Sequence, residues 1–421
     1  MFLNIFMWWL LMEITVQGNA KVKGKVKISG SKNAALPIIC ASILNRGKVI
    51  LRNIPRISDV FDMCNILKYL NCKVKFKGNT LIIMSKNIVY KPLLLEECKK
   101  IRASYYFIGV FLFLFKKCEI LLPGGCKIGS RPIDYHLKAF NDMGYKYNIE
   151  NNILTIEKEK NNESFDITLI NKSVGTTMNV ILAGLGFNDG IIGNSLIEPE
   201  CEDLISFLNI IGFNIENTSS NVVIKAHNKI NTKIKYEIIP DRIEAMTYTV
   251  LGLLCGDLVI NKCNPKHLLS PLNILKEAGY KLDFKQECLH VYKSVGNQIN
   301  IKTEVYPGFP TDLQPIFGVL ASQTINDSYI EETVFENRMQ IYKDLINSGV
   351  ECIIQDNKVQ INPSKIISNN YKAYDLRHGA ALIILASIGD KGSMISNFEV
   401  ILRGYENIIK KLKKIGIYVK S

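Results

Sequence analysis

The chain has 421 residues, of which 47% are hydrophobic and 22% are charged, so it is long enough for two or three domains with full cores and is neither disordered nor a small disulfide scaffold. Its formal net charge of +13 is typical of proteins that bind nucleic acid, an anionic membrane or a polyanionic small molecule. The lysines are scattered, without a basic stripe that has interleaved aromatic residues. We therefore predict no nucleic-acid partner, and keep a basic repeat protein that binds nucleic acid as an alternative of a different class.

Residues 1–11, MFLNIFMWWLL, form an apolar N-terminal extension. They lack the basic start and the cleavage site of a signal peptide, and they are shorter than the roughly 20 residues that span a bilayer. An alternative is that translation begins at Met12, so that residues 1–11 are not translated. A second apolar run, YYFIGVFLFLF at 105–115, is also too short to span, and it predicts a buried core helix and no stable membrane insertion.

A recurring helix end divides the chain into six similar units. The six stretches are LKYLNCKV, FNDMGYKY, LNIIGFNI, LKEAGYKL, LINSGVEC and LKKIGIYV. Each contains a residue suited to a left-handed helix cap, which is Gly in five units and Asn in one. These markers are 67 to 73 residues apart: Asn71, Gly144, Gly212, Gly279, Gly349 and Gly416.

Each unit also begins alike, with a polar residue before an apolar helical run. A turn, a β-rich run, a second amphipathic helix that ends at the marker, and another strand follow. The first residues, which we call the heads, are Lys32, Arg102, Gly175, Arg242, Asp312 and Arg377. Four of the six are cations at the N-terminus of a helix, which itself attracts anions.

The heads predict a site for a polyanion if the units pack as two groups of three with their heads facing. Asp312 is the single acidic head. It is either an N-cap, with Thr311 nearby, or a general base, and spacing alone leaves both open.

One loop, LPGGCKIGSRP at 122–132, places Cys126 between a Gly-Gly pair and a proline. Lys127 and Arg131 lie close in sequence, and Pro132 suits the first turn of a following helix. Such positive surroundings make a thiol reactive, and the glycines would let the loop act as a lid. The alternative is an ordinary exposed thiol.

The other ten cysteines form no CxxC pair and no Cys/His cluster with zinc-ligand spacing. This pattern is typical of free thiols in a reducing compartment, so we predict a cytoplasmic protein without a structural metal. The five histidines are unclustered, and we interpret His136 and His290 as packing or surface residues.

From Met12 onward, short stretches in order along the chain resemble the UDP-N-acetylglucosamine 1-carboxyvinyltransferases, a family of enolpyruvyl transferases. The matching stretches are ISGSKNAALP (28–37), RAS (102–104), LPGGCKIGSRPIDYHL (122–137), SVG (173–175), EPE (198–200), PDRIE (240–244), PGFPTDLQ (307–314), ETVFENR (332–338), DLR (375–377) and RGYE (403–406).

The resemblance implies an α/β (α+β) fold, a two-domain inside-out α/β barrel built from six repeated βαβαββ-type units, three per domain. The first domain would comprise residues 12–31 plus 240–421, with Asp312, Arg377 and Arg403. The second would comprise residues 32–239 and carry the Cys126 lid loop. A two-strand hinge would join them.

The resemblance also implies the reaction. The enolpyruvyl group of phosphoenolpyruvate would move to the 3-hydroxyl of UDP-N-acetylglucosamine by addition and elimination, with release of phosphate, as the first committed step of peptidoglycan synthesis. Cys126 would be the general acid and Asp312 the candidate general base. No cofactor and no metal are implied, and fosfomycin would inactivate Cys126 covalently.

The resemblance also implies roles for other residues of this chain, each at the position that matches the family's motif. Lys32, Arg131 and Arg403 would bind the phosphate and carboxylate of phosphoenolpyruvate, with Lys32 and Arg403 also counted as catalytic. Arg102 and Arg377 would complete the cationic wall, and Asn33 would hold the sugar. The uridine diphosphate would be bound by Arg131, Pro132, Asp134, Lys172, Ser173, Gly175 and Phe335. Supporting ion pairs would involve Glu198, Arg242, Glu336, Arg338 and Asp375. Only small-molecule substrates are expected as partners of a monomer or weak oligomer.

Two positions depart from the family pattern. The chain has VILRGYE where the family usually shows HIDRGYE, and His378 where a small residue usually follows Arg377. The nearest alternative enzyme is 5-enolpyruvylshikimate-3-phosphate synthase, which has a GSKS-type head and a Gly-Asn-Ala-Gly-Thr segment. Here the head is GSKN and that segment is missing.

Overall fold

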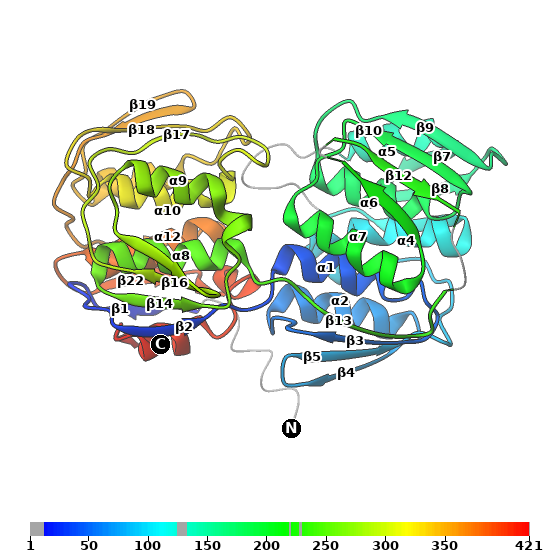
Figure 1. The fold of residues 1–421 in the computed structure, drawn as a ribbon, viewed down its shortest axis with the longest axis horizontal. Coiled ribbons are helices and arrows are strands. Elements are labelled where there is room, and N and C mark those ends of the chain that lie inside the picture. Colours follow the sequence, from blue (N-terminus) through cyan, green and yellow to red (C-terminus); the bar gives the residue numbers. More distant parts are fainter. Residues whose placement is uncertain (1–11, 124–132, 219, 227–229, 421) are drawn as a thin grey trace. The chain divides into compact units, whose positions relative to one another are not determined.

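The computed structural model describes residues 12–123, 133–218, 220–226 and 230–420. These residues form two compact units (Figure 1). Unit 1 contains residues 12–29 and 240–420, and unit 2 contains residues 30–123 and 133–239. The described chain passes between the units at residues 29–30 and 239–240, so unit 2 is an insertion into the sequence of unit 1.

Unit 2 contains three small sheets, with strand orders β13-β3-β5-β4, β6-β8-β7 and β11-β12-β10-β9. Its strands are β3 (Lys48–Arg52), β4 (Lys73–Lys77), β5 (Thr80–Met84), β6 (Lys117–Leu121), β7 (Tyr145–Glu150), β8 (Ile153–Lys158), β9 (Ser164–Thr168), β10 (Asp189–Gly193), β11 (Asn214–Asn217), β12 (Val222–Lys225) and β13 (Lys233–Glu237). Its helices are α1 (Lys32–Ala41), α2 (Ser58–Tyr69), α3 (Glu96–Lys100), α4 (Tyr106–Phe115), α5 (Asp134–Asp142), α6 (Val174–Gly184) and α7 (Pro199–Ile211), with a short 3-10 helix at Arg102–Tyr105.

Unit 1 also contains three sheets, with strand orders β21-β22-β1-β23, β15-β16-β14-β2 and β17-β18-β20-β19. Its strands are β1 (Ile14–Val16), β2 (Gly24–Lys27), β14 (Leu258–Asn261), β15 (Leu282–Lys285), β16 (Cys288–Val291), β17 (Asn300–Lys302), β18 (Ser328–Glu331), β19 (Cys352–Gln355), β20 (Lys358–Ile361), β21 (Tyr371–Lys372), β22 (Ser393–Ser396) and β23 (Val419–Lys420). Its helices are α8 (Arg242–Cys255), α9 (Leu269–Glu277), α10 (Gln314–Ala321), α11 (Gln340–Asn347), α12 (Leu376–Ile388) and α13 (Ile408–Lys414), with 3-10 helices at Pro265–Leu268, Thr311–Leu313 and Phe398–Arg403.

The six sheets share one topology, which confirms the six predicted repeats. In five sheets, a parallel pair is followed by two antiparallel pairs, as in β2-β14-β16-β15. In the sixth, Leu93 forms a parallel bridge to β6, which then pairs antiparallel with β8, and β8 with β7. The repeats are therefore structural copies, three in each unit.

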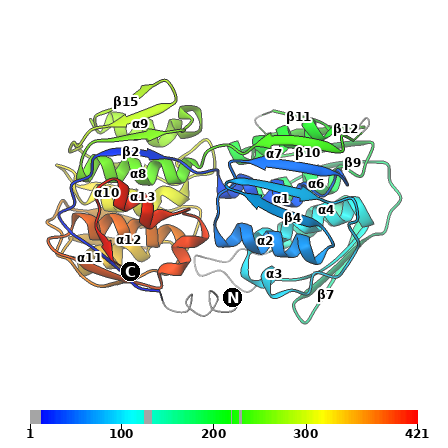
Figure 2. The ribbon, with the colours of Figure 1, turned by 90° about the horizontal axis from the view of Figure 1, so that it is seen from below.

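Helices occupy the interior of each unit and sheets the outside, as the fold class predicted. In unit 1, α8, α10 and α12 pack against one another and bury almost all their residues (Figures 1 and 2). In unit 2, α4 packs against α1 and α6. The strands bury alternate residues, as in β3 and β8, so one face of each sheet covers the helices and the other faces solvent.

The apolar run at 105–115 forms α4, whose Phe107, Ile108, Val110, Phe111 and Leu112 are buried, as predicted for a core helix. Among the described residues, none of the helices combines the length and the apolar character that a membrane crossing requires.

The predicted left-handed caps are confirmed at all six markers. Asn71 has φ of 66°, and the five glycines have φ between 84° and 123°. In five units the residue after the marker donates its backbone N–H to a carbonyl five residues earlier, as Phe213 does to Leu208 at 3.2 Å. This bond satisfies a carbonyl that the helix end leaves unpaired.

The two segments that connect the units form hydrogen bonds with buried carboxylates. Ser29 donates its N–H to Glu244 at 2.8 Å, and Asp203 accepts the Tyr236 hydroxyl at 2.6 Å and the Ile239 N–H at 3.4 Å. Burial raises the pKa of Asp203 to about 6, although these hydrogen bonds oppose the rise. Asp203 is therefore a buried acid that holds a proton more tightly in the folded chain than in the unfolded chain.

We expect this proton to make stability depend on pH. Between the unfolded pKa of about 4 and the folded value of about 6, the folded state binds more protons, so stability falls as pH rises through this range. The loss amounts to about 3 kcal/mol at most. Urea unfolding at pH 4 to 7 should show this slope in the wild-type chain and a smaller slope in Asp203→Asn. The exposed Asp166→Asn serves as the control, and equal slopes in all three chains would contradict the prediction.

Candidate active site

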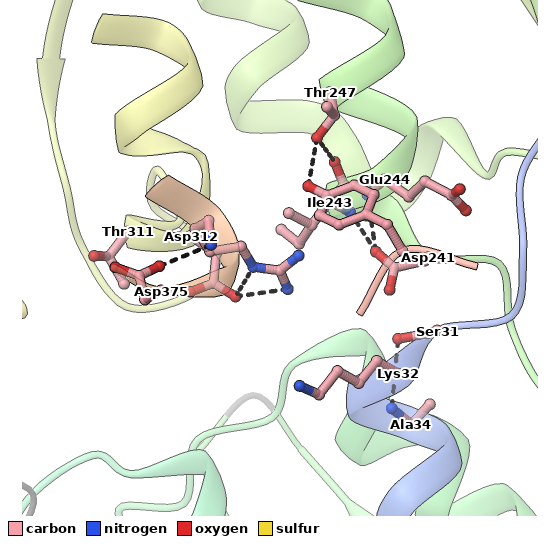
Figure 3. Close-up of polar contacts among 12 residues, drawn as sticks. Ser31, Lys32, Ala34, Asp241, Ile243, Glu244, Thr247, Thr311, Asp312 and Asp375 are labelled. Atoms are coloured by element: carbon pink, nitrogen blue, oxygen red, sulfur yellow. Dashed lines mark hydrogen bonds and ion pairs between the residues drawn. The ribbon is translucent and has the colours of Figure 1, made fainter. Parts of the chain in front are cut away.

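Two of the three helix heads of unit 1 follow an aspartate that caps the helix (Figure 3). Asp241 accepts the N–H groups of Ile243 and Glu244, both at 2.9 Å, and so caps α8. Asp375 accepts the N–H groups of Arg377 at 2.7 Å and His378 at 3.1 Å, and so caps α12. Asp375 was predicted to form a supporting ion pair, and its observed contacts are these two capping bonds. The caps fix the first turns of the helices that carry Arg242 and Arg377.

Asp312 lies in the 3-10 helix before α10 and is bound by two arginines. Its Oδ1 lies 2.9 Å from Arg338 Nη1, and its Oδ2 lies 3.0 Å from Arg377 Nε and 2.9 Å from Arg377 Nη2. The side chains of Arg338 and Arg377 are 5% and 6% exposed, whereas that of Asp312 is 26% exposed. The N-cap alternative is wrong, because neither the 3-10 helix nor α10 has a side-chain cap.

The charge of Arg377 is stabilised by its surroundings. Burial opposes the charge, but Asp312 and Tyr405 outweigh burial and hold the pKa of the guanidinium above its usual value. The Arg377 guanidinium also lies 6.0 Å from the centre of the Tyr405 ring. Arg377 is therefore a permanent buried cation at the start of α12.

Glu332 is a buried carboxylate that the sequence analysis missed. One oxygen accepts the Thr303 hydroxyl at 2.9 Å and the N–H groups of Val334 at 2.8 Å and Phe335 at 3.0 Å. The other accepts the Thr311 hydroxyl at 2.8 Å. Glu332 therefore joins the loop that carries Phe335 to the turn that carries Asp312. Its place at the start of ETVFENR was the available signal.

Arg338 and Arg403 are two further arginines of unit 1 that the sequence analysis named. Arg338 donates to the Thr311 hydroxyl at 2.8 Å, and its guanidinium lies 5.1 Å from the centre of the Phe335 ring. Arg403 is half-buried and ends the 3-10 helix Phe398–Arg403. The structure thus brings together Asp312, Arg377, Arg338 and Phe335, all predicted from the sequence.

His378, which departs from the family pattern, is accommodated inside unit 1. It is 2% exposed, its Nε2 lies 2.7 Å from Asp344 Oδ2, and its Nδ1 accepts the Tyr374 N–H at 3.2 Å. Because Nδ1 is an acceptor, the ring carries its proton on Nε2 and donates it to Asp344. The hydrogen bond between His378 and Asp344 therefore joins α12 to α11, and the neighbouring Arg377 forms an ion pair with Asp312.

In unit 2, the head of α1 combines a cap with an ion pair. The Ser31 hydroxyl accepts the Ala34 N–H at 3.4 Å (Figure 3). Lys32 Nζ lies 2.7 Å from Asp59 Oδ2, and the side chains are 12% and 4% exposed. Asn33 follows on the exposed side of the first turn. Asp59 is a second carboxylate that the sequence analysis missed, and it orients the Lys32 ammonium group.

Arg102 lies on a 3-10 helix rather than on α4 itself, with its guanidinium 5.1 Å from the centre of the Tyr105 ring. The Tyr105 ring packs against His136 at 5.9 Å, and Asn179 donates to Tyr105 O at 2.8 Å. Burial, together with the charge of Arg102, lowers the pKa of His136 to about 3. His136 is therefore a neutral packing residue, as predicted.

The other predicted substrate-binding residues of unit 2 that the structure describes lie at the starts of α5 and α6, which pack together. Ser173 caps α6 by accepting the Thr176 N–H at 3.3 Å, and exposed Lys172 precedes it. A Cβ at Gly175 would lie 3.8 Å from the His136 ring, and exposed Asp134 is the first residue of α5. Cys126, Arg131 and Pro132 lie outside the described residues.

The ten cysteines in the described part of the chain are free. Eight are buried, and Cys288 and Cys352 are half-buried. Burial raises the pKa of Cys64, Cys72 and Cys98 to about 12, which makes them poor nucleophiles. In the same described residues, no three or more His, Cys, Asp or Glu side chains group in a way that could hold a metal ion.

Sequence comparison relates this chain to known enzymes over nearly its full length. The family model for EPSP synthase (3-phosphoshikimate 1-carboxyvinyltransferase) matches residues 16–412. A UDP-N-acetylglucosamine 1-carboxyvinyltransferase of Pelagibacter ubique is 37% identical over 416 residues, which cover 97% of this chain and 99% of the relative. The enzyme of the same name from Thermotoga petrophila is 36% identical over 414 residues, 97% of this chain and 98% of the relative.

Solved structures share the fold at lower sequence identity. The enolpyruvyl transferase NikO from Streptomyces tendae superposes with a TM-score of 0.88 at 18% identity, covering 97% of this chain and 98% of the other. An EPSP synthase from Acinetobacter baumannii superposes with a TM-score of 0.77 at 15% identity, covering 97% and 100%. The family match and the relatives that align over nearly the full length lead to one conclusion. This chain belongs to the enolpyruvyl transferase family and, within it, groups with the UDP-N-acetylglucosamine 1-carboxyvinyltransferases.

Proposed function

We propose that this chain transfers the enolpyruvyl group of phosphoenolpyruvate to the 3-hydroxyl of UDP-N-acetylglucosamine, with release of phosphate. This reaction is the first committed step of peptidoglycan synthesis. The observation that carries the proposal is the 35–37% identity to enzymes of that name over 96–97% of the chain. We place the enzyme in the cytoplasm, as a monomer or weak oligomer with small-molecule partners only.

Phosphoenolpyruvate presents a phosphate and a carboxylate, and the cationic heads suit both groups. Lys32, Arg131 and Arg403 are assigned to these anions, with Arg102 and Arg377 beside them. Guanidinium groups can bind either anion through two parallel hydrogen bonds, and an ammonium group acts as a point charge. The fixed orientations of Lys32 by Asp59 and of Arg377 by Asp312 support this assignment, because a preorganised cation does not have to be ordered when substrate arrives.

The reaction balances as an addition followed by an elimination. In the addition, the Cys126 thiol gives a proton to the methylene carbon, the sugar 3-oxygen bonds to the adjacent carbon, and Asp312 takes the hydroxyl proton. In the elimination, the new methyl group returns a proton to the Cys126 thiolate, which restores the double bond, and phosphate leaves with the proton that Asp312 had taken. The two arginines that bind Asp312 hold its carboxylate ionised and in a fixed orientation. They lower its basicity, so they support the base role through orientation alone.

The nucleotide sugar is assigned to eight residues. Asn33 holds the sugar. The uridine diphosphate is held by Arg131, Pro132, Asp134, Lys172, Ser173, Gly175 and Phe335. The capped start of α6 at Ser173 and the glycine at 175 support this, because a helix start without a bulky side chain leaves room for a phosphate to approach the backbone.

We expect phosphate release from phosphoenolpyruvate only when UDP-N-acetylglucosamine is the acceptor. The assay compares this acceptor with shikimate 3-phosphate, using protein that begins at Met12. Release with the nucleotide sugar alone would support the proposal. Release only with shikimate 3-phosphate would instead favour the alternative enzyme, 5-enolpyruvylshikimate-3-phosphate synthase, and no release with either acceptor would contradict enolpyruvyl transfer.

A further inference from the structure

A basic pocket lies between β2 and α13 of unit 1, and none of the site residues assigned above lines it. Its volume is about 220 Å³, and it is lined mainly by lysines. In Figure 1, β2 is blue and the C-terminal helix is red. We call this feature the lysine pocket and define it by Lys25, Lys27, Lys410, Lys411 and Lys414.

The fold gathers these lysines because of two regular spacings. Lys25 and Lys27 are two residues apart on β2, so they share its exposed face while Val26 is buried. Lys410 and Lys414 are four residues apart on α13, so they share one face of that helix. β2 is the edge strand of its sheet, and α13 packs beside it. Like charges at these spacings repel one another, so the arrangement costs stability unless an anion binds.

One of the five lysines is neutralised within the protein. Lys411 Nζ donates to Glu244 Oε1 and, at 2.7 Å, to the Ser29 hydroxyl, and its side chain is 16% exposed. No ion pair within 4.0 Å joins Lys25, Lys27, Lys410 or Lys414 to a carboxylate of the described residues. The lysine pocket therefore keeps four positive charges without an acidic partner in that part of the chain.

The chemistry of the lining indicates the ligand. Ammonium groups are compact point charges with three donors each, and they suit the tetrahedral oxygens of phosphate. Among the described residues, no aromatic side chain lines the pocket, so these residues offer no surface on which a nucleic-acid base could stack. Asn407 adds an amide at its rim.

We propose that the lysine pocket binds an anion that carries two or more phosphate charges. This site is separate from the residues proposed for catalysis, and its test does not depend on enolpyruvyl transfer. The anion has two possible sources, a soluble polyphosphorylated molecule or the headgroup of an anionic lipid.

The experiment uses the full chain and a matched pair of triple variants. Lys27→Gln, Lys410→Gln and Lys414→Gln together remove three charges from the pocket. Lys411 is kept because it also pairs with Glu244. The control removes three charges from β4 with Lys73→Gln, Lys75→Gln and Lys77→Gln, which are exposed lysines on one strand of unit 2. Both variants therefore have the same net charge.

In the first arm, inorganic tripolyphosphate is titrated by calorimetry at fixed ionic strength. We expect the pocket variant to bind at least about tenfold more weakly than wild type, as the loss of three ion pairs predicts, and the control to stay within about twofold. In the second arm, the same proteins are sedimented with cardiolipin vesicles, because the cardiolipin headgroup carries two phosphates. If the pocket variant loses binding only to tripolyphosphate, the ligand is a soluble molecule. If the pocket variant loses binding to the vesicles, the ligand is a lipid headgroup.

A third measurement needs no variant. Acetylation of wild-type lysines, read by mass spectrometry, should slow at Lys25, Lys27, Lys410 and Lys414 when tripolyphosphate or vesicles are present, and should not change at Lys73, Lys75 and Lys77. The proposal is overturned if neither probe binds, if both variants weaken binding equally, or if neither probe protects the pocket lysines more than those of β4.

Discussion

Replacing Cys126 by alanine should lower kcat for enolpyruvyl transfer by about 10²- to 10⁴-fold, the range expected when a general acid is removed. Affinity for UDP-N-acetylglucosamine should change little, because the thiol is assigned to the proton that phosphoenolpyruvate receives. Phosphate release gives kcat, and calorimetry with the nucleotide sugar gives the affinity. No other thiol of the described residues should replace it, since eight of those ten cysteines are buried and the other two are half-buried.

The half-buried Cys288 provides the matched control, and Cys288→Ala should keep wild-type turnover. Fosfomycin adds a second readout. In the presence of UDP-N-acetylglucosamine, intact mass should show one adduct on the wild-type chain and on Cys288→Ala, and none on Cys126→Ala. An unmodified Cys126 after prolonged exposure would contradict the reactive-thiol assignment, and a Cys126→Ala chain that fails to fold would show a structural role instead.

Replacing Asp312 by alanine should have the largest effect on stability. It leaves two guanidinium groups, whose side chains are 5% and 6% exposed, without their shared carboxylate. Removing one partner of a buried pair costs about 3–5 kcal/mol, and we expect about 2–4 kcal/mol because Asp312 is 26% exposed. Urea unfolding measures the change. As the control, Glu304→Ala removes an exposed ion pair with Lys302 in the same unit and should cost less than about 1 kcal/mol.

Asp312→Asn separates the base role from the structural role. The amide keeps the size of the side chain and one oxygen that can accept from an arginine, so more stability should remain than in Asp312→Ala. Turnover should still fall by about 10²- to 10⁴-fold, since an amide does not accept the hydroxyl proton. An Asp312→Asn chain with wild-type kcat would show that the carboxylate is structural only.

The repeats could be predicted from the sequence because their signals are local. A residue such as Asn71 or Gly279 must adopt positive φ to end its helix, and few residue types do so readily. The heads were found for the same reason, since a polar residue before an apolar run marks a helix start. The burial of α4 followed from the length and uniform apolarity of its run.

Which residue pairs with which head could not be predicted, because the partners are distant in the chain. Asp312 binds Arg338 and Arg377, which are 26 and 65 residues away, and these contacts compete with the local N-cap that the sequence also allowed. Glu332 and Asp59 were missed for the same reason, since each is recognised only through groups that the fold brings to it. Local rules thus fail where long-range polar contacts decide the orientation of a side chain.

The insertion of unit 2 has a consequence for the order of events on the ribosome. All of unit 2 has been made once residue 239 is added, and a domain can fold as its chain emerges. In unit 1, by contrast, β1 at Ile14–Val16 pairs with β22 at Ser393–Ser396 and with β23 at Val419–Lys420. At about 5–20 residues per second, β1 waits roughly 20 to 80 s for these partners, so the earliest described strand is among the last to be paired.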